Sequence, residues 1–363
     1  MRVLFLIGDR IWSGRVRAFA VAADGLRERG HQVAVVCPPG SDVESRLDPA
    51  AYELLPLNIS GPWPAAAARI RRAVSERFVE VIFVHTDREQ LIASAAARSA
   101  GRAAVLRRVS PGENVVLTRR AKMAMRFAAT GFVFASESEM RNAGEIRGTR
   151  VASVFATSGA DANAADSLRG PARALAGASG VTQLIVCAYD RTSRIRAAPV
   201  LRVASLLAPR HPDLRVAVVG PGSTEEELRM HAAALRITKI VRFLGDRPDA
   251  FSVLRAADLG WVVAQSDDGV FAMLDLMAAR VPVLAERSPV TEQYIADGIT
   301  GVLFDRTESA AIAAPVARLL AHDDERSAMA SAGRARVARD FPLAQMIDGF
   351  ERAGESARGF ARW

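Results

Sequence analysis

Short apolar runs alternate with longer stretches of helical composition along almost the whole chain. In the first half the apolar runs lie at residues 3–7, 32–37, 52–57, 79–84, 103–107, 132–135 and 151–155. Helical stretches, among them 15–29, 64–77 and 88–99, separate these runs. Continuous β-branched runs are typical of strands that are buried on both faces of a parallel sheet. The pattern therefore predicts an α/β domain with a doubly wound parallel sheet.

The same alternation restarts after a segment of different composition. Residues 160–180 are rich in alanine, glycine and serine and have no clear period, which predicts a linker. Further apolar runs follow at 184–188, 214–219, 240–244, 259–263, 281–285 and 301–304, and the tail is helical. The expected division is an N-terminal Rossmann-like domain over 1–165, a linker over 166–180, a C-terminal Rossmann-like domain over 181–342 and a final helix over 343–363.

The segment 266–282 carries the most specific chemical signal. It follows the apolar run 259–263 and predicts a short loop and then a helix over 271–279. Asp275 falls in the middle of this nearly apolar helix, where an unpaired carboxylate would cost several kcal/mol. A hydroxyl-rich or cationic ligand is therefore expected near it. Asp267 is expected on the loop at the carboxyl end of the strand, where open parallel sheets bind their ligands.

In the N-terminal half, polar residues that could form part of a site follow two of the predicted strands. The turn 8–14 contains Ser13 and Gly14 before a helix, and a helix N-terminus favours anions. It lacks the G-x-G-x-x-G pattern of dinucleotide sites. His85 ends another strand, where it could act as a base, bind a sugar hydroxyl or serve only as a structural histidine.

The net charge of +8 is concentrated in the N-terminal half. This half is expected to face an anionic molecule. Residues 119–127 mix basic and apolar side chains at helical spacing, which is compatible with peripheral contact with an anionic membrane or with an ordinary charged helix face. Nucleic-acid binding is not expected, because no recognition motif is present.

Cysteine content and hydropathy predict a cytoplasmic protein, either soluble or peripherally attached at the inner membrane face. The two cysteines, Cys37 and Cys187, lie in apolar runs and predict buried thiols without metal-ligand spacing. The apolar start of the chain ends at Gly8, too early for a signal peptide or a membrane span.

Asp267 and Asp275, separated by seven residues at a strand–helix junction, resemble the E-x7-E signature of retaining glycosyltransferases of family four, the glycosyl transferases group 1. The family's E-A-M-A-x-G-x-P is similar to residues 275–282, with Arg280 where glycine is usual. The turns Gly220-Pro221-Gly222 and Phe243-Leu244-Gly245 also resemble family segments. The chain departs from the family at the second histidine position, where it reads Leu106-Arg107-Arg108.

The resemblance implies a GT-B fold, with two Rossmann-like domains, a cleft between them and a C-terminal helix that crosses back to the first domain. It implies transfer of a sugar, with retention, from a nucleotide-sugar to a glycan or lipid-linked acceptor in cell-surface glycan biosynthesis. No metal or other cofactor is implied, because cationic side chains neutralise the leaving diphosphate in this family.

The resemblance also assigns residues. Asp267 would contact the donor sugar and Asp275 the ribose, while Arg191 and Arg194 would replace the family's G-R-x4-K clamp on the diphosphate. His85 completes the catalytic candidates. The remaining donor-binding candidates are Ser13, Gly14, Gly220, Gly222, Gly245, Asp268 and Gly269.

Two other functions stay open at this point. The shortened acids, the rewritten clamp and Arg280 are compatible with a non-catalytic GT-B protein that binds a nucleotide or a partner without transfer. A sugar-nucleotide epimerase on the same fold would form product without an acceptor.

Overall fold

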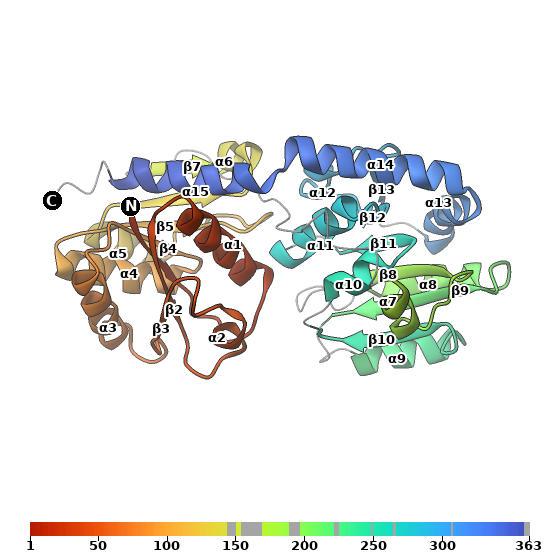
Figure 1. Ribbon diagram of the computed structural model, residues 1–363, viewed down its shortest axis with the longest axis horizontal. Helices are drawn as coiled ribbons and strands as arrows, with labels where there is room; N and C mark the ends of the chain where they lie inside the picture. The colour runs from red at the N-terminus through yellow and green to blue at the C-terminus, as the bar shows by residue number, and fades with distance from the viewer. Residues whose placement is uncertain are drawn as a thin grey trace. The chain divides into compact units, whose positions relative to one another are not determined.

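The computed structural model comprises two compact units, Met1–Ala156 with Leu343–Trp363 and Thr157–Pro342 (Figure 1). It describes residues 1–363 except 144–149, 154–168, 189–196, 221–224, 248–249, 264–265, 306–307 and 359–363. Each unit is a parallel sheet with helices on both faces, so the predicted α/β class with two Rossmann-like domains is confirmed.

The first unit contains a seven-stranded sheet. Its strands, in spatial order, are β3 (Glu53–Pro56), β2 (Gln32–Cys37), β1 (Arg2–Leu6), β4 (Val81–Val84), β5 (Ala104–Arg108), β6 (Thr130–Phe134) and β7 (Arg150–Ser153). All neighbours pair in parallel, with Val3 opposite Val33 on one side and Val81 on the other. The strand order reverses between β1 and β4.

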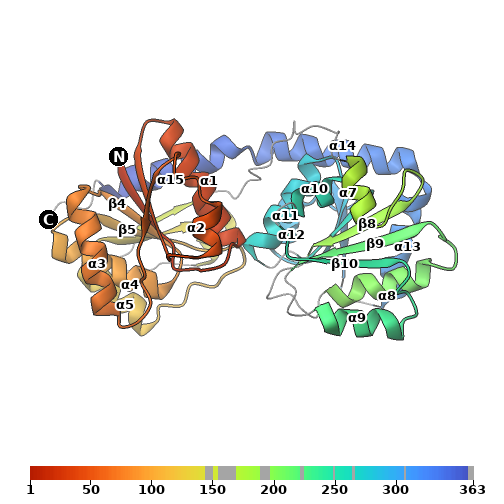
Figure 2. The same ribbon diagram turned by 60° about the horizontal axis from the view of Figure 1, so that its bottom comes forward.

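Helices cover both faces of this sheet. They are α1 (Gly14–Glu28), α2 (Asp42–Arg46), α3 (Trp63–Glu76), α4 (Asp87–Ala100), α5 (Arg119–Phe127), α6 (Glu137–Asn142) and α15 (Leu343–Arg358). Helix α4 packs between α3 and α5, whereas α15 lies against α1 and the strands β4 to β7 (Figure 2). These two layers bury the sheet between them.

The alternation of side chains along β1 separates two hydrophobic layers. Leu4 and Leu6 point into the aliphatic cluster beneath α3 and α4. Phe5 points the other way and stacks on Phe83 with 5.2 Å between the ring centroids, and Phe350 from α15 packs edge-on against Phe83 at the same separation. Burial of each such side chain stabilises the fold by roughly 1.5–3 kcal/mol.

Ion pairs fix the C-terminal helix α15 to the first unit. Arg29, just after α1, contacts Asp348 and Glu351 at 2.6 Å each. His31 Nε2 lies 2.6 Å from the other oxygen of Glu351. The predicted return of the last helix to the first domain is therefore confirmed, and an aromatic core contact and a charged contact both maintain it.

The second unit contains a six-stranded parallel sheet. In spatial order its strands are β10 (Val241–Gly245), β9 (Leu214–Val219), β8 (Gln183–Ala188), β11 (Leu259–Val262), β12 (Val283–Glu286) and β13 (Gly301–Phe304). Its helices are α7 (Arg169–Leu175), α8 (Ala198–Leu207), α9 (Glu225–Ala234), α10 (Ala250–Arg255), α11 (Asp267–Ala278), α12 (Thr291–Tyr294), α13 (Ser309–Ala321) and α14 (Asp323–Asp340).

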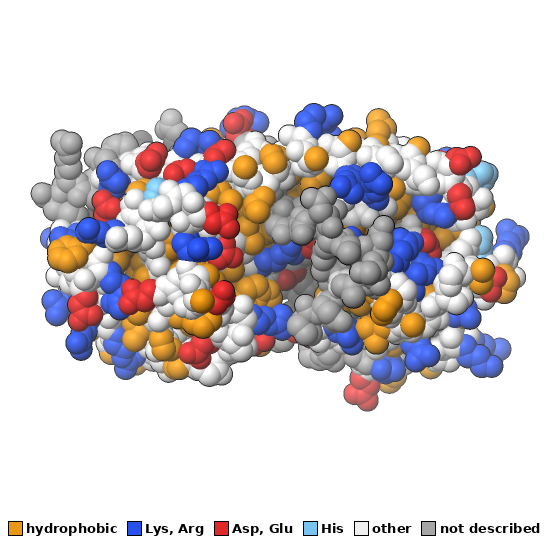
Figure 3. Space-filling view, viewed as in Figure 1, with side chains coloured by type: hydrophobic (Ala, Val, Ile, Leu, Met, Phe, Trp, Pro, Cys, Tyr) orange, Lys and Arg blue, Asp and Glu red, His pale blue; other side chains and the backbone are white. Residues whose placement is uncertain are grey.

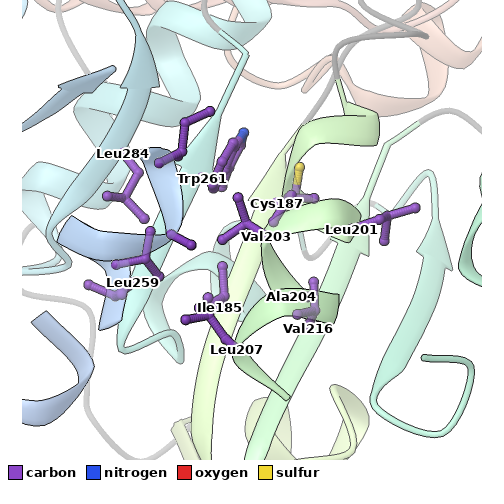
Figure 4. Close-up of a cluster of buried hydrophobic side chains, with 14 of the residues drawn as sticks. Ile185, Cys187, Leu201, Val203, Ala204, Leu207, Val216, Leu259, Trp261 and Leu284 are labelled. Carbon is purple, nitrogen blue, oxygen red and sulfur yellow. The ribbon is translucent and has the colours of Figure 1, made fainter. Parts of the chain in front are cut away.

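A hydrophobic cluster joins this second sheet to α8 and α13. Figure 4 shows Trp261 and Leu259 of β11 beside Val203 and Leu207 of α8. Cys187 lies in the same cluster, and burial raises the pKa of its thiol to about 12. Cys187 and Cys37 are both free and buried, as the sequence predicted.

Part of the predicted linker is an ordered helix. Helix α7 falls within residues 166–180 and belongs to the second unit. Its Arg173 is buried and donates hydrogen bonds to the carbonyl oxygens of Ser179 (3.1 Å) and Ala256 (2.9 Å) and to Asp258. The sequence pattern missed this helix because polar contacts of Arg173 and Arg169, rather than an apolar stripe, dock it.

Charges of both signs lie on one face of the first unit. In Figure 3 lysine and arginine side chains are dispersed among acidic ones over the face shown. Among the residues that the structure describes, no helix combines the length and apolar character needed to cross a bilayer.

Candidate functional site

The second sheet places a candidate ligand site where its strand order reverses. β8 and β11 are neighbours, and Ala188 lies opposite Val262 at their carboxyl ends. The helices that follow these strands depart to opposite faces of the sheet, α8 against α13 and α11 against α10 and α14. A crevice at such a point is the usual binding site of open α/β sheets.

Helix α11 starts at this point and carries both candidate acids. Asp267 is its first residue and Asp275 lies two turns further on, about 12 Å along the helix axis. Both side chains are only 2% exposed. Asp268, in contrast, is exposed.

The helix begins four residues earlier than the sequence predicted. The sequence predicts Asp267 on a loop and Gly269 at the break between the strand and the helix, but both residues lie in the first turn of α11. Two acidic residues in a first turn interact favourably with the positive end of the helix dipole, which compensates for the low helix propensity of Gly269. Asp267 thus belongs to the helix itself.

A glycine in β11 allows α11 to approach the sheet closely. A Cβ atom at Gly260 would lie 2.4 Å from Leu276 Cδ1, far inside van der Waals contact. Leu276 follows Asp275 directly, so this contact fixes the depth at which Asp275 lies beside the sheet.

Two of the predicted glycines meet at the carboxyl ends of β9 and β10. The Gly220 amide donates a hydrogen bond to the carbonyl oxygen of Gly245 at 3.0 Å, and Gly245 has a φ of +67°. Arg191, Arg194 and Gly222 lie outside the described residues.

Arg280 occupies a backbone conformation that favours glycine. Its φ is +59°, and it ends α11 with its amide bonded to the Met277 carbonyl oxygen. A left-handed conformation costs an L-residue roughly 1–2 kcal/mol. The departure from the family's glycine is therefore accommodated with strain and without loss of the turn.

In the first unit, His85 is enclosed by protein rather than presented to solvent. Its side chain is 3% exposed and stacks on Phe19 with 3.6 Å between the ring centroids. Its Nε2 atom lies 2.8 Å from the carbonyl oxygen of Arg15. Because a carbonyl oxygen only accepts, this contact assigns the proton to Nε2. These contacts favour a structural role for His85, and its catalytic assignment stays a prediction.

We expect His85 to make the protein less stable in mild acid. Burial lowers its pKa well below 6.5, and the charges of Arg108 and Arg15 act in the same direction. Below pH 6.5 the unfolded chain therefore binds a proton that the native state does not. The free energy of unfolding should fall by up to about 1.4 kcal/mol per pH unit until the native pKa is reached.

Urea unfolding between pH 7.5 and 5.5 measures this effect against His85→Gln, which retains an N–H donor. The variant should lose less stability on acidification than the wild type, and His322→Gln, at an exposed position, should behave like the wild type. If the free energy of unfolding changed equally with pH in the wild type and in His85→Gln, the assignment of this pH dependence to His85 would be refuted.

Arg107 occupies the segment where the family often has a second histidine. Its guanidinium pairs with Asp87 and Glu113 and donates to the His85 carbonyl oxygen at 3.0 Å. Two carboxylates thus bind this side chain. It connects the ends of β4 and β5.

Ser13 and Gly14 lie at the start of α1, as the sequence predicted. The serine hydroxyl does not cap the helix. The sequence patterns considered above do not include Glu89, a buried carboxylate beside this loop. The spacing Thr86-x-x-Glu89, a capping box, could have identified it.

Within the described residues, no group of three or more His, Cys, Asp or Glu side chains is arranged to hold a metal ion.

Known proteins resemble this chain first in fold and then in sequence. The fold is that of GT-B glycosyltransferases: the structure of HepE from Anabaena, in complex with UDP and glucose, matches 98% of this chain and 100% of its own with a TM-score of 0.81 and 17% identity. Residues 186–336 match the model of glycosyl transferases group 1. These residues lie in the C-terminal unit, and the predicted resemblance to that family is confirmed.

Curated proteins that are similar to this chain are also glycosyltransferases. A D-inositol 3-phosphate glycosyltransferase of Corynebacterium urealyticum is 32% identical over 149 residues, which span 39% of this chain and only 35% of the relative. A GDP-mannose-dependent α-(1-6)-phosphatidylinositol monomannoside mannosyltransferase of Mycolicibacterium smegmatis is 26% identical over 351 residues, 88% of this chain and 89% of the relative.

Proposed function

We propose that the protein is a retaining, metal-independent glycosyltransferase that moves a sugar from a nucleotide-sugar to a glycan or lipid-linked acceptor. The observation that carries this proposal is the pair of buried acids on α11, directly after the strand at which the order of the sheet reverses. Buried carboxylates on such a helix can accept hydrogen bonds from ribose and sugar hydroxyls as well as from protein donors.

In this proposal each acid has its own part of the donor. Asp267, in the first turn of α11, contacts the sugar, and Asp275 binds the ribose. Arg191 and Arg194, assigned from the sequence alone, neutralise the diphosphate. That neutralisation lowers the barrier, because the leaving group gains negative charge in an oxocarbenium-like transition state.

The names of the relatives support an acceptor that carries phosphate, and a role in cell-envelope glycolipid synthesis. Inositol 3-phosphate and phosphatidylinositol mannoside are both anionic. The excess of positive charge in the N-terminal half of this chain is complementary to such acceptors.

Calorimetric titration with UDP, GDP and ADP, and with their sugar conjugates, tests the proposal. Micromolar binding of one nucleotide is expected and would name the base for a screen of acceptors. Product that forms from the sugar conjugate without an acceptor would indicate an epimerase. Failure of every nucleotide to bind would contradict the transferase and favour a non-catalytic GT-B protein.

We also propose that α5 contacts anionic membrane at its basic face. Ala121 and Ala124 are buried, whereas Arg119 and Lys122 are exposed. A helix with a cationic outer face is attracted to anionic headgroups, and salt screens this attraction.

Flotation with phosphatidylserine-containing vesicles tests the membrane contact. The wild type should float with the vesicles at low salt. At 1 M salt, screening of the charges should lower the vesicle-bound fraction by about ten-fold or more. Arg119→Glu with Lys122→Glu should remain unbound, and Arg210→Glu with Lys239→Glu in the second unit, with the same change in net charge, should still float. Equal binding by both double variants would refute a role for α5.

A further inference from the structure

The carboxylate of Glu89 joins two loops of the first unit. Its Oε1 accepts the Gly8 amide at 2.7 Å, and its Oε2 accepts the amides of His85 and Thr86 at 2.9 Å each. The side chain is 3% exposed. Gly8 follows β1 and His85 follows β4, so Glu89 links the two strands between which the order of the first sheet reverses.

Helix capping accounts for only one of these bonds. Thr86 and Glu89 form a capping box at the start of α4, in which the Thr86 hydroxyl accepts the Glu89 amide at 3.1 Å. A capping box needs one bond from the glutamate back to the cap. The bond from Oε1 to Gly8, 81 residues earlier in the chain, has no part in capping.

The absence of a side chain at Gly8 makes this bond possible. A Cβ atom there would lie 2.7 Å from Glu89 Oε1 and 3.1 Å from Ile59 Cδ1. The other half of the β1–α1 loop has its own anchor, since Asp42 accepts the Trp12 amide and donates its own amide to the Arg10 carbonyl oxygen, both at 3.0 Å. Glu89 therefore determines the position of the first half of the loop.

The β1–α1 loop carries polar groups suited to a hydroxylated ligand, Asp9 in its first half and Ser13 in its second. Asp9 Oδ1 contacts Arg15 at 3.3 Å. Within the described residues, the buried atoms Asp9 Oδ2 and Ser13 Oγ have no hydrogen-bond partner. A sugar or inositol ring would supply donors and acceptors to both.

The buried charge is costly, which argues for a role beyond packing. Burial raises the pKa of Glu89, and the nearby charge of Asp9 raises it further. A neutral side chain would cap α4 without this penalty, but an amide cannot accept all three backbone N–H groups.

We propose that Glu89 is a positioning residue, which holds the β1–α1 loop, residues 8–13, in the conformation that receives the acceptor. This assignment rests on the proposed function, because the loop has an acceptor to receive only if the protein is a transferase. Glu89 acts through Gly8 and Asp9 and does not touch the reacting atoms.

A double-mutant cycle on the full chain tests the link between Glu89 and Gly8. Amide hydrogen exchange, measured by mass spectrometry over residues 8–15, should speed up about ten-fold or more in Glu89→Gln and in Gly8→Ala. The double variant should exchange no faster than either single variant, because both remove the same bond. Exchange over 183–304 should stay unchanged.

Two further variants keep the test decisive. Glu44→Gln alters another carboxylate that accepts a glycine amide, at 2.6 Å from Gly40, and should leave exchange over 8–15 unchanged. Glu89→Asp keeps the charge but is too short to reach Gly8, and should reproduce the effect if Glu89→Gln does not fold. Additive effects in the cycle, or unchanged exchange in Glu89→Asp, would overturn the assignment.

Transfer kinetics separate positioning from general support of the fold. With D-inositol 3-phosphate as the acceptor probe, Glu89→Gln should raise the acceptor KM or lower kcat by up to about 100-fold, as expected for a shift of ~1 Å, with unchanged nucleotide affinity. An equal loss of nucleotide affinity would overturn the positioning role. Absence of nucleotide binding by the wild type would refute the proposed function instead, and the exchange cycle would still decide whether Glu89 holds the loop.

Discussion

Asp275→Asn is expected to weaken nucleotide binding by about 10- to 100-fold. A hydrogen bond to a charged group is worth about 1.5–3 kcal/mol, and the amide keeps the shape of the carboxylate but loses its charge and one acceptor. Asp275 is 2% exposed on a helix that Leu276 fixes against β11. Neighbouring side chains therefore have little freedom to compensate.

Calorimetry with the nucleotide that binds the wild type measures this effect. Asp213→Asn is the matched control, because Asp213 is an exposed acid in the same unit. It lies immediately before β9 and thus at the amino ends of the strands, opposite to the candidate site. Urea unfolding of both variants separates loss of the site from loss of the fold. Wild-type affinity in a folded Asp275→Asn protein would remove Asp275 from the donor site.

Arg173→Leu is expected to destabilise the second unit by about 3–5 kcal/mol. The substitution leaves Asp258 without its buried cation, and breaking a buried pair from one side has a cost of this size. It also removes the donor to the carbonyl oxygens of Ser179 and Ala256. Asp258 retains the Leu184 amide at 2.8 Å, which offsets only part of the loss.

Arg169→Leu provides the control, because Arg169 pairs with the same Asp258 at 3.2 Å but is 46% exposed. An exposed pair contributes at most about 1 kcal/mol. Denaturant unfolding should therefore rank Arg173→Leu far below Arg169→Leu in stability. Similar losses in the two variants would show that α7 is not held by the buried pair.

The apolar pattern predicted the architecture well for a physical reason. Strands of a parallel sheet are buried on both faces, so β1, β4 and β8 appear as continuous apolar runs that need no tertiary information. Helix boundaries were less accurate where polar residues set them. The start of α11 at Asp267 depends on acids that stabilise a first turn, and α7 depends on the buried Arg173.

The sequence by itself indicated two Rossmann-like units and two acids eight positions apart after one strand, and the family resemblance implied a returning C-terminal helix. The structure placed both acids on one helix. Only the tertiary structure decided which polar groups meet. Glu89 and Gly8 are 81 residues apart, and Arg107 lies 22 residues from His85. Such contacts follow from the order β3-β2-β1-β4-β5-β6-β7, which brings strand ends together at one edge of the sheet. Local pattern records which face of an element is buried, whereas the partners of a buried charge depend on the packing of distant segments.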